Sequence, residues 1–163
     1  LRHLAKENGV EAQVLNAVLE ANSAQITRAE TMVEHSQARK VGMIGVSFKP
    51  GTDDMRESPL AELAGRLISS GIGVEIYDPF VFEAYSEANS TAGRGNDAVP
   101  DLQSRLVGDL DTLIASSDAI MVGNIYKETL PELNEAALTT PIIDLARLDR
   151  SKVSGGSYAG ICW

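Results

Sequence analysis

Residues 41–46 read VGMIGV, and after a charged loop residues 58–71 read SPLAELAGRLISSG. The first run is short, apolar and interrupted by glycine, which is typical of a strand buried on both faces. In the second run, Ser58 suits the N-cap of a helix, Pro59 its first position and Gly71 its end. Leucine and isoleucine recur between them at helical spacing, which gives the helix one apolar face. The two runs therefore predict a buried strand, a loop and an amphipathic helix.

The same alternation of strand and helix patterns continues along the chain. Short apolar runs predict further strands at 74–77, 119–122 and 141–144, and a short edge strand at 106–107. Helical spacing predicts short helices over 110–114 and 131–138. Weak periodicity indicates an irregular segment over 83–105, with a short helix within it as an alternative. Strands joined through helices by short connections predict a Rossmann-like α/β fold, with a doubly wound and mainly parallel sheet.

A longer helix is predicted ahead of the sheet. Residues 12–36 carry apolar side chains at three- and four-residue spacing: Leu15, Val18, Leu19, Ile26, Ala29 and Val33. Asn22 falls on the same stripe, where we expect a buried amide that fixes the register of the helix. The first 36 residues hold no partner for the stripe, so it packs on the following domain or on another chain. We therefore divide the chain into a helical segment, 1–37, and an α/β domain, 38–163.

Composition excludes several classes of protein. With 163 residues, 44% of them hydrophobic and 23% charged, the chain is suited to one folded domain and not to disorder. No apolar run approaches the roughly 20 residues of a membrane span. The single cysteine, Cys162, excludes a disulfide scaffold and is expected to be a buried packing residue, and we expect a cytoplasmic location. A net charge of −9 argues against nucleic-acid binding. Because the chain starts at Leu1, partway through a helical pattern, we expect a fragment of a longer protein.

The predicted strand ends point to a small anionic ligand. In an open parallel sheet, ligands bind beyond the carboxyl ends of the strands. The residues at these ends are Ser47-Phe48-Lys49, Asp78, Gly123-Asn124, and Asp144 with Arg147 close behind. A lysine after one strand and an arginine after another suit a molecule that carries phosphate, the lysine as a point charge and the arginine as a fork.

Residues 47–59, SFKPGTDDMRESP, concentrate charge in the loop after the first strand. We expect Asp53 and Asp54 to be structural, because either carboxylate can pair with Arg56 or Lys49 and hold the loop in shape. Lys49 and Arg56 are instead expected to bind a ligand, because a loop beside a strand end does not need two basic groups for its own folding.

The chain carries no recognisable catalytic set. Gly42 and Gly45 lie within the strand, so the glycine-rich turn of a dinucleotide site is absent, and we do not expect NAD to bind this chain alone. His3 and His35 have no cysteine at metal-ligand spacing, so no metal site is expected. The sequence therefore predicts a binding surface without a nucleophile.

The stretch SFKPGTDDMRESP resembles the C-terminal domain of the UDP-glucose/GDP-mannose dehydrogenase family. It lies between RKVGMIGV and LAELAGRLISSG, and three further stretches follow in the order that the family shows: VEIYDP at 74–79, SSDAIMVGN at 116–124 and PIIDLAR at 141–147. Residues 1–36 resemble the end of the helical segment that joins the two domains of the family. The resemblance covers nearly the whole chain.

The resemblance implies a part of an enzyme that oxidises the C6 alcohol of a nucleotide-sugar to a carboxylate in two NAD-dependent steps. It implies that Phe48 and Lys49 contact the nucleotide-sugar, that Arg56 reaches the NAD of the assembled site, and that Arg147 contacts substrate. It also implies a missing N-terminal NAD-binding domain and a catalytic cysteine upstream of Leu1, so this chain alone is expected to be inactive. Family members pair through the helical segment, which makes the stripe on 15–33 a candidate homodimer contact.

Alternatives remain for the substrate and for the kind of protein to which this chain belongs. The wording GTDDMRESPLAELA at 51–64 and the terminal GICW favour GDP-mannose, whereas the Phe-Lys-Pro string and Arg147 are at least as typical of enzymes that use UDP-glucose. A stand-alone binding module, of which a receiver domain is an example, is a second hypothesis. Asn124 counts against a receiver domain, because an aspartate is expected there. A third hypothesis is a subunit whose other half is a separate polypeptide.

Overall fold

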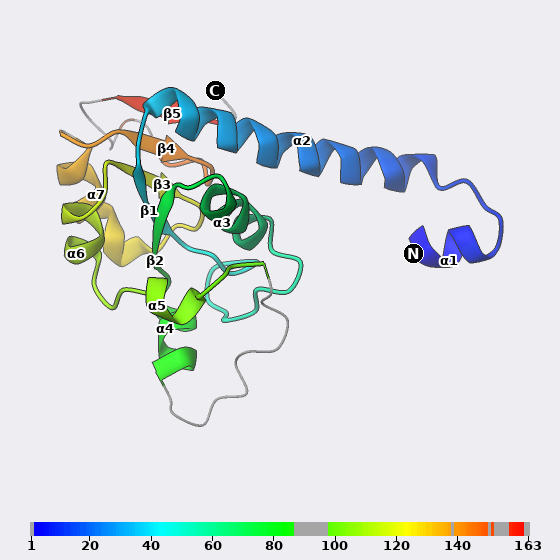
Figure 1. Ribbon diagram of the computed structural model, residues 1–163, viewed down its shortest axis with the longest axis horizontal. Helices are drawn as coiled ribbons and strands as arrows, with labels where there is room; N and C mark the ends of the chain where they lie inside the picture. The colour runs from blue at the N-terminus through cyan, green and yellow to red at the C-terminus, as the bar shows by residue number, and fades with distance from the viewer. Residues whose placement is uncertain (1, 87–97, 138, 150, 152–156, 162–163) are drawn as a thin grey trace.

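A single parallel sheet forms the centre of the computed structural model, which describes residues 2–86, 98–137, 139–149, 151 and 157–161 (Figure 1). The strands are β1 (Lys40–Ile44), β2 (Gly73–Tyr77), β3 (Ala119–Val122), β4 (Ile142–Asp144) and β5 (Tyr158–Gly160). Their order across the sheet is β2-β1-β3-β4-β5, and every neighbouring pair is parallel. The predicted fold class is confirmed.

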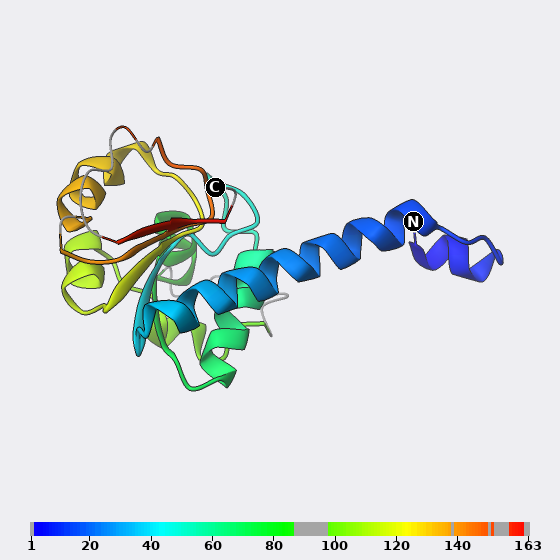
Figure 2. The same ribbon diagram turned by 90° about the horizontal axis from the view of Figure 1, so that it is seen from above.

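Helices cover both faces of this sheet, and Figure 1 shows α1 away from it, at the far end of α2. The helices of the described residues are α1 (Arg2–Glu7), α2 (Gln13–Ser36), α3 (Pro59–Ser69), α4 (Pro79–Ser86), α5 (Leu102–Arg105), α6 (Leu110–Ala115) and α7 (Leu130–Ala136), with a 3-10 turn, η1, at Lys127–Thr129. Figure 2 shows α2 and α3 on one side of the strands and α6 and α7 on the other. The helices predicted over 12–36, 58–71, 110–114 and 131–138 correspond to α2, α3, α6 and α7.

Burial on both faces explains the apolar runs of the strands. Successive side chains of a strand point to opposite faces of a sheet. Met43 and Met121 therefore pack in the core beneath α2 and α3, whereas Ile44, Ile120 and Val122 pack with the core that includes residues of α6 and α7. Because both layers are apolar, every residue of β3 is buried.

The strand β5 was not predicted, whereas β1 to β4 match the four main predicted strands. It is three residues long and pairs with β4 through flanking bonds: the Ile142 amide donates to the Ser157 carbonyl at 2.8 Å, and the Ile161 amide to the Asp144 carbonyl at 3.0 Å. The edge strand predicted at 106–107 is reduced to one isolated parallel bridge, between Leu106 and Ile76 of β2. Both outcomes depend on what the adjacent strand offers and not on local pattern.

The short helix allowed for in the irregular segment over 83–105 is present as α5, and the segment also begins with the end of α4, which was not predicted. Helix α4 starts directly after β2 and reaches Ser86, and α5 occupies 102–105. Asp78 caps the start of α4, since its carboxylate accepts a hydrogen bond from the Val81 amide at 3.3 Å. Residues 87–97 lie outside the described residues.

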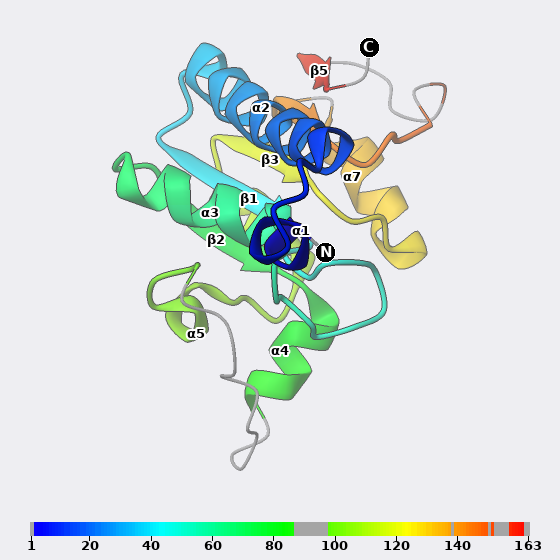
Figure 3. The same cartoon turned by 90° about the vertical axis from the view of Figure 1, so that its right-hand side faces the viewer.

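The apolar stripe of α2 divides between two environments. Figure 3, a view along α2, shows this helix beside α3. Ile26 and Val33 lie in the core that also contains residues of α3, whereas Val18 is 51% and Leu19 is 44% exposed. Asn22, predicted to be buried, is exposed in this chain. The helix therefore packs on its own domain through its C-terminal half, and the predicted boundary at residue 37 stays a prediction.

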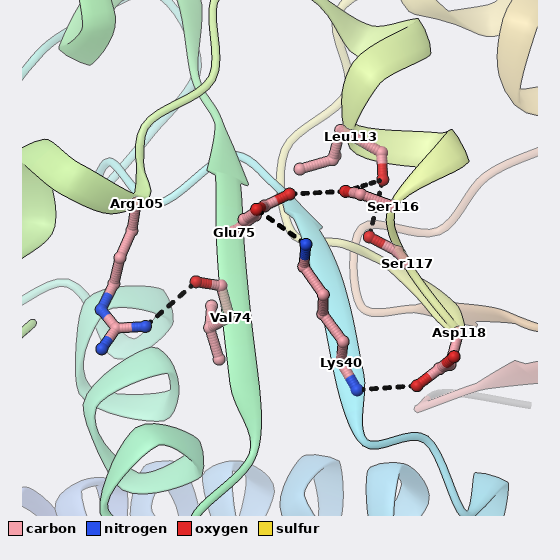
Figure 4. A network of polar contacts seen from close by, with 8 residues as sticks. All are labelled: Lys40, Val74, Glu75, Arg105, Leu113, Ser116, Ser117 and Asp118. Atoms are coloured by element: carbon pink, nitrogen blue, oxygen red, sulfur yellow. Dashed lines mark hydrogen bonds and ion pairs between the residues drawn. The ribbon is translucent and has the colours of Figure 1, made fainter.

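A polar network joins β1, β2 and β3 on the side of the sheet away from the predicted ligand edge (Figure 4). The Asp118 carboxylate accepts hydrogen bonds from the amides of Arg39 and Lys40, both at 2.9 Å. The Lys40 ammonium forms an ion pair with Glu75 at 2.7 Å, and Ser116 donates to the same carboxylate. The hydrogen bond from Lys40 is the main cause that lowers the pKa of Glu75. This network is structural, because each group finds its partner within the fold.

Two negative findings concern the part of the chain that the structure describes. None of its helices combines the length and apolar character that crossing a membrane requires. Its histidine, cysteine, aspartate and glutamate side chains form no group of three or more that could hold a metal ion.

Ser58 joins α3 to the end of β1 and provides a test of the fold. Its hydroxyl donates to the Val46 carbonyl at 2.8 Å and accepts from the Ala61 amide at 3.3 Å. We expect Ser58→Ala to lower the free energy of unfolding by about 1–2 kcal/mol, because both buried partners lose a hydrogen bond. Urea denaturation measures the change. Ser104→Ala, at an exposed serine, serves as the control and should stay within about 0.5 kcal/mol of the parent. An equal loss in the two variants contradicts the role given to Ser58.

Candidate functional site

The strand order makes the carboxyl ends of β1 and β3 a topological switch point. The chain leaves β1 toward β2 on one side and later places β3 on the other, so the connections diverge at this point. Such a switch point is where open α/β sheets bind ligands. The loop that leaves β1, residues 45–58 and called the β1–α3 loop below, begins at this switch point and carries the charged cluster identified in the sequence.

Asp78 holds the start of the β1–α3 loop. Its carboxylate is fully buried, and one oxygen accepts hydrogen bonds from the amides of Val46 and Ser47, both at 3.1 Å. A buried charge is tolerated where several donors surround it, and backbone N–H groups supply them here. The end of β2 therefore fixes the path of the chain as it leaves β1.

Asn124, which follows the end of β3, holds the same loop from the neighbouring strand. Its amide nitrogen donates to the Ser47 carbonyl at 3.2 Å and to the Ser47 hydroxyl at 3.1 Å. Gly45 makes this approach possible, because a Cβ there would lie 2.4 Å from the Cβ of Asn124, and its φ of +84° suits glycine. The two strand ends are thus joined through side chain and main chain.

Tyr126 lies buried in the connection that follows β3 and was not among the residues predicted for the site. Its ring meets those of Tyr77 and Phe80 with centroids 6.4 Å away in each case, and it is 4% exposed. Burial first, and then the charge of Asp78, raises the pKa of its hydroxyl, so the phenol stays protonated. Within the described part of the chain, this hydroxyl makes no hydrogen bond of ordinary geometry. No strand or helix period marks Tyr126 in the sequence, because it lies in the connection between β3 and η1.

Phe48 and Lys49 project from the β1–α3 loop into solvent. Phe48 is 59% exposed, which is unusual for a large apolar ring, and Lys49 is also exposed. Their backbone is nevertheless fixed: the Phe48 amide donates to the Asp54 carbonyl at 2.8 Å, and the Ser47 hydroxyl donates to the Lys49 carbonyl at 3.1 Å. The structure therefore offers an aromatic ring and a cation at the switch point, on an ordered support.

Arg56 pairs with Asp54 through two parallel contacts. The Nε donates to Oδ1 at 2.9 Å and the Nη2 to Oδ2 at 2.7 Å. The hydrogen bonds from Arg56 lower the pKa of the Asp54 carboxyl from 3.8 to about 2. The structural role predicted for Asp54 is confirmed, with Arg56 as its partner, and Asp53 is exposed. The structure thus brings Phe48, Lys49 and Arg56 together on one loop.

Arg147 lies on a separate loop at the same edge of the sheet. It follows β4, is exposed, and has a φ of +65°, in the left-handed region. Asp144 shapes this loop, because its buried carboxylate accepts from the amides of Ala146 and Leu148, both at 2.8 Å, and from the Tyr158 hydroxyl. The strand β3 lies between β1 and β4, so the loops of Lys49 and Arg147 follow strands that are separated by one strand.

The arrangement suits binding more than catalysis. Residues 45–58 form a long connection between β1 and α3, in place of the tight glycine-rich turn of a dinucleotide site. Cys162 lies outside the described residues, so its predicted packing role stays a prediction. Cations on two loops and an exposed ring match a small anionic ligand with an aromatic part.

Comparison with known proteins identifies the family. A model of the UDP-glucose/GDP-mannose dehydrogenase family, UDP binding domain, matches residues 42–148. The chain belongs to this family. The matched range runs from β1 through β4 and includes the β1–α3 loop and Arg147, so the resemblance stated from residues 47–59 is confirmed.

Relatives extend the similarity to the whole chain. GDP-mannose 6-dehydrogenase of Pseudomonas syringae pv. syringae is 37% identical over 168 residues, which cover 100% of this chain and 37% of that protein. The crystal structure of GDP-mannose dehydrogenase from Pseudomonas aeruginosa matches 99% of this chain and 37% of its own, with a TM-score of 0.82 and 32% identity. A UDP-glucose dehydrogenase from Pyrobaculum islandicum matches 99% of this chain and 35% of its own, with a TM-score of 0.72 and 25% identity. This family member therefore spans little more than a third of the length of the curated relatives it matches.

The pairing of Asp54 with Arg56 predicts a specific titration. The pKa of Asp54 is lower in the folded chain than its ordinary value of 3.8. The pair therefore contributes its full stabilisation at pH values above 3.8, and this contribution is lost as the pH falls through about 2. In Arg56→Ala, the pKa of the Asp54 carboxyl should rise from about 2 toward 3.8, as measured by NMR of the side-chain carboxyl carbon, and the amide of residue 56 still donates to this carboxyl. Lys49→Ala is the matched control, since Lys49 is the smallest of the causes, and it should leave the midpoint near 2. A midpoint unmoved by Arg56→Ala contradicts the pairing.

Proposed function

We propose that this chain is the nucleotide-sugar-binding part of an NAD-dependent GDP-mannose 6-dehydrogenase. The observation that carries the proposal is the similarity to GDP-mannose dehydrogenases along the entire chain, together with the exposed Phe48 and Lys49 at the switch point. The reaction converts the C6 alcohol of GDP-mannose to the carboxylate of GDP-mannuronate. Two hydrides pass to two NAD, and one water supplies the second carboxylate oxygen.

The described residues support the binding half of this reaction. A pyrophosphate carries negative charge that Lys49 can meet as a point charge and Arg147 as a planar fork. The Phe48 ring presents an apolar face beside that charge. Arg56 is proposed to reach the NAD phosphates once the NAD-binding domain closes over this edge of the sheet. The catalytic cysteine and the NAD-binding domain of the proposal belong to segments outside this chain.

UDP-glucose is the second candidate substrate. The family model that matches residues 42–148 is that of a UDP binding domain, and the match to a UDP-glucose dehydrogenase extends over 99% of the chain. The higher identity and TM-score of the GDP-mannose enzymes favour GDP-mannose. A direct comparison of the two nucleotide-sugars in the enzyme that contains this chain distinguishes the two proposals.

Assembly and location are also part of the proposal. The exposed apolar residues on the N-terminal half of α2 support homodimer formation through this helix, because a second copy would remove them from water. A cytoplasmic location, expected from the single cysteine, stays a prediction.

The isolated chain should not turn over substrate. We expect the 163-residue chain to fold and to produce no NADH from NAD with GDP-mannose or UDP-glucose, because it offers no dinucleotide turn between β1 and α3. Absorbance of NADH measures the reaction, and circular dichroism verifies folding. Steady NADH production by the folded chain would refute the assignment of catalysis to segments outside it.

Lys49 should contribute binding and not stability. In the enzyme that contains this chain, Lys49→Ala is expected to raise the KM for GDP-mannose about tenfold, since one charge-assisted contact to phosphate is lost. The melting temperature should not change, because the side chain is exposed. Arg39→Ala is the control: it removes an exposed cation from the opposite edge of the sheet, and its KM should match the parent. Equal KM values for Lys49→Ala and the parent would remove Lys49 from the site.

A further inference from the structure

A chain of hydrogen bonds runs from the core to the backbone of Lys49. The Asn124 amide nitrogen donates to the Ser47 hydroxyl at 3.1 Å, and this hydroxyl donates to the Lys49 carbonyl at 3.1 Å. The direction is set by chemistry, because an amide nitrogen only donates and a carbonyl only accepts. The hydroxyl of Ser47 therefore uses both of its capacities, one toward β3 and one toward the loop.

Burial makes this relay rigid at one end. Ser47 is 0% and Asn124 is 5% exposed, whereas Lys49 is exposed. A hydrogen bond in a buried, low-dielectric setting is stronger than one in water, and leaving such a group unpaired is costly. The Asp78 carboxylate accepts a hydrogen bond from the Ser47 amide at 3.1 Å. Ser47 is therefore fixed through both its backbone and its hydroxyl.

We infer that Ser47 and Asn124 are positioning residues for the binding of the nucleotide-sugar phosphates by Lys49. The lysine side chain is long and mobile, and ordering it on a ligand costs conformational entropy. A backbone that is already fixed at the Lys49 carbonyl lowers the part of that cost that comes from the loop. Since Asn124 belongs to the end of β3 and Ser47 to the end of β1, the relay also ties the two sides of the switch point to each other. This inference rests on the proposed function.

A double-mutant cycle in the enzyme that contains this chain tests the inference. The affinities for GDP-mannose and for UDP-glucose are measured by isothermal titration calorimetry in the parent, Ser47→Ala, Lys49→Ala and the double variant. Ser47→Ala should weaken binding of the preferred nucleotide-sugar about fivefold to tenfold, the loss expected for one hydrogen bond. In the Lys49→Ala background, the same substitution should change affinity less than about twofold, because it acts through Lys49.

The control separates positioning from general loosening. Ser58 is another buried serine, and its hydroxyl donates to the Val46 carbonyl just after β1. Its hydroxyl accepts from the Ala61 amide, so neither of these hydrogen bonds involves Lys49. Ser58→Ala should lower thermal stability and change affinity less than about twofold. If Ser47→Ala prevents folding, Asn124→Ala enters the cycle in its place, since it removes the first donor of the relay.

The outcomes are distinct. Equal losses on Ser47→Ala with and without the lysine, or no loss in the parent background, overturn the positioning role while the proposed function stands. An unchanged affinity in Lys49→Ala alone overturns the binding role proposed for Lys49, and with it the positioning role inferred for Ser47 and Asn124. A loss in Ser58→Ala as large as that in Ser47→Ala shows that the loop is merely loosened, which also overturns the inference.

Discussion

The buried carboxylate of Asp78 is the interaction on which the geometry of the site depends. It accepts hydrogen bonds from the amides of Val46 and Ser47 at the end of β1, and from the Val81 amide at the start of α4. Three segments that meet at the carboxyl edge of the sheet are therefore joined by one side chain. An unpaired carboxylate at this depth would be strongly unfavourable, so the charge and its donors stabilise each other.

The sheet provides the rigid support that this interaction needs. Two apolar layers bury β1 and β3 on both faces. The polar groups that follow these strands, on Ser47 and Asn124, form hydrogen bonds with each other. The close approach of Gly45 to Asn124 follows from that packing, since any side chain at residue 45 would separate the strand ends. The fixed contact between the ends of β1 and β3 is thus a consequence of core packing. The exposed residues of the β1–α3 loop extend from this contact.

Charge is arranged differently at the two edges of the sheet. At the edge shown in Figure 4, Lys40 is matched by Glu75 in an ion pair within the fold. At the carboxyl edge, Asp54 pairs with Arg56, and Lys49 and Arg147 are exposed on the loops that follow β1 and β4. In a chain with a net charge of −9, exposed basic groups at this edge support the proposed binding of an anion.

The strands β1 to β4, the main helices and the charged cluster at 47–59 could be predicted from the amino-acid sequence, because strand and helix periods and the Ser58 cap are properties of neighbouring residues. The pairing of Asp54 could be predicted as well, since both partners lie in one loop.

Other features depend on how distant segments pack. The strand β5 exists because β4 offers it an edge, and the contact of Ser47 with Asn124 joins residues 77 positions apart. Asn22 is exposed because α2 extends past the surface that buries Ile26. Contacts between distant segments form only when the whole sheet packs, and no local pattern encodes them.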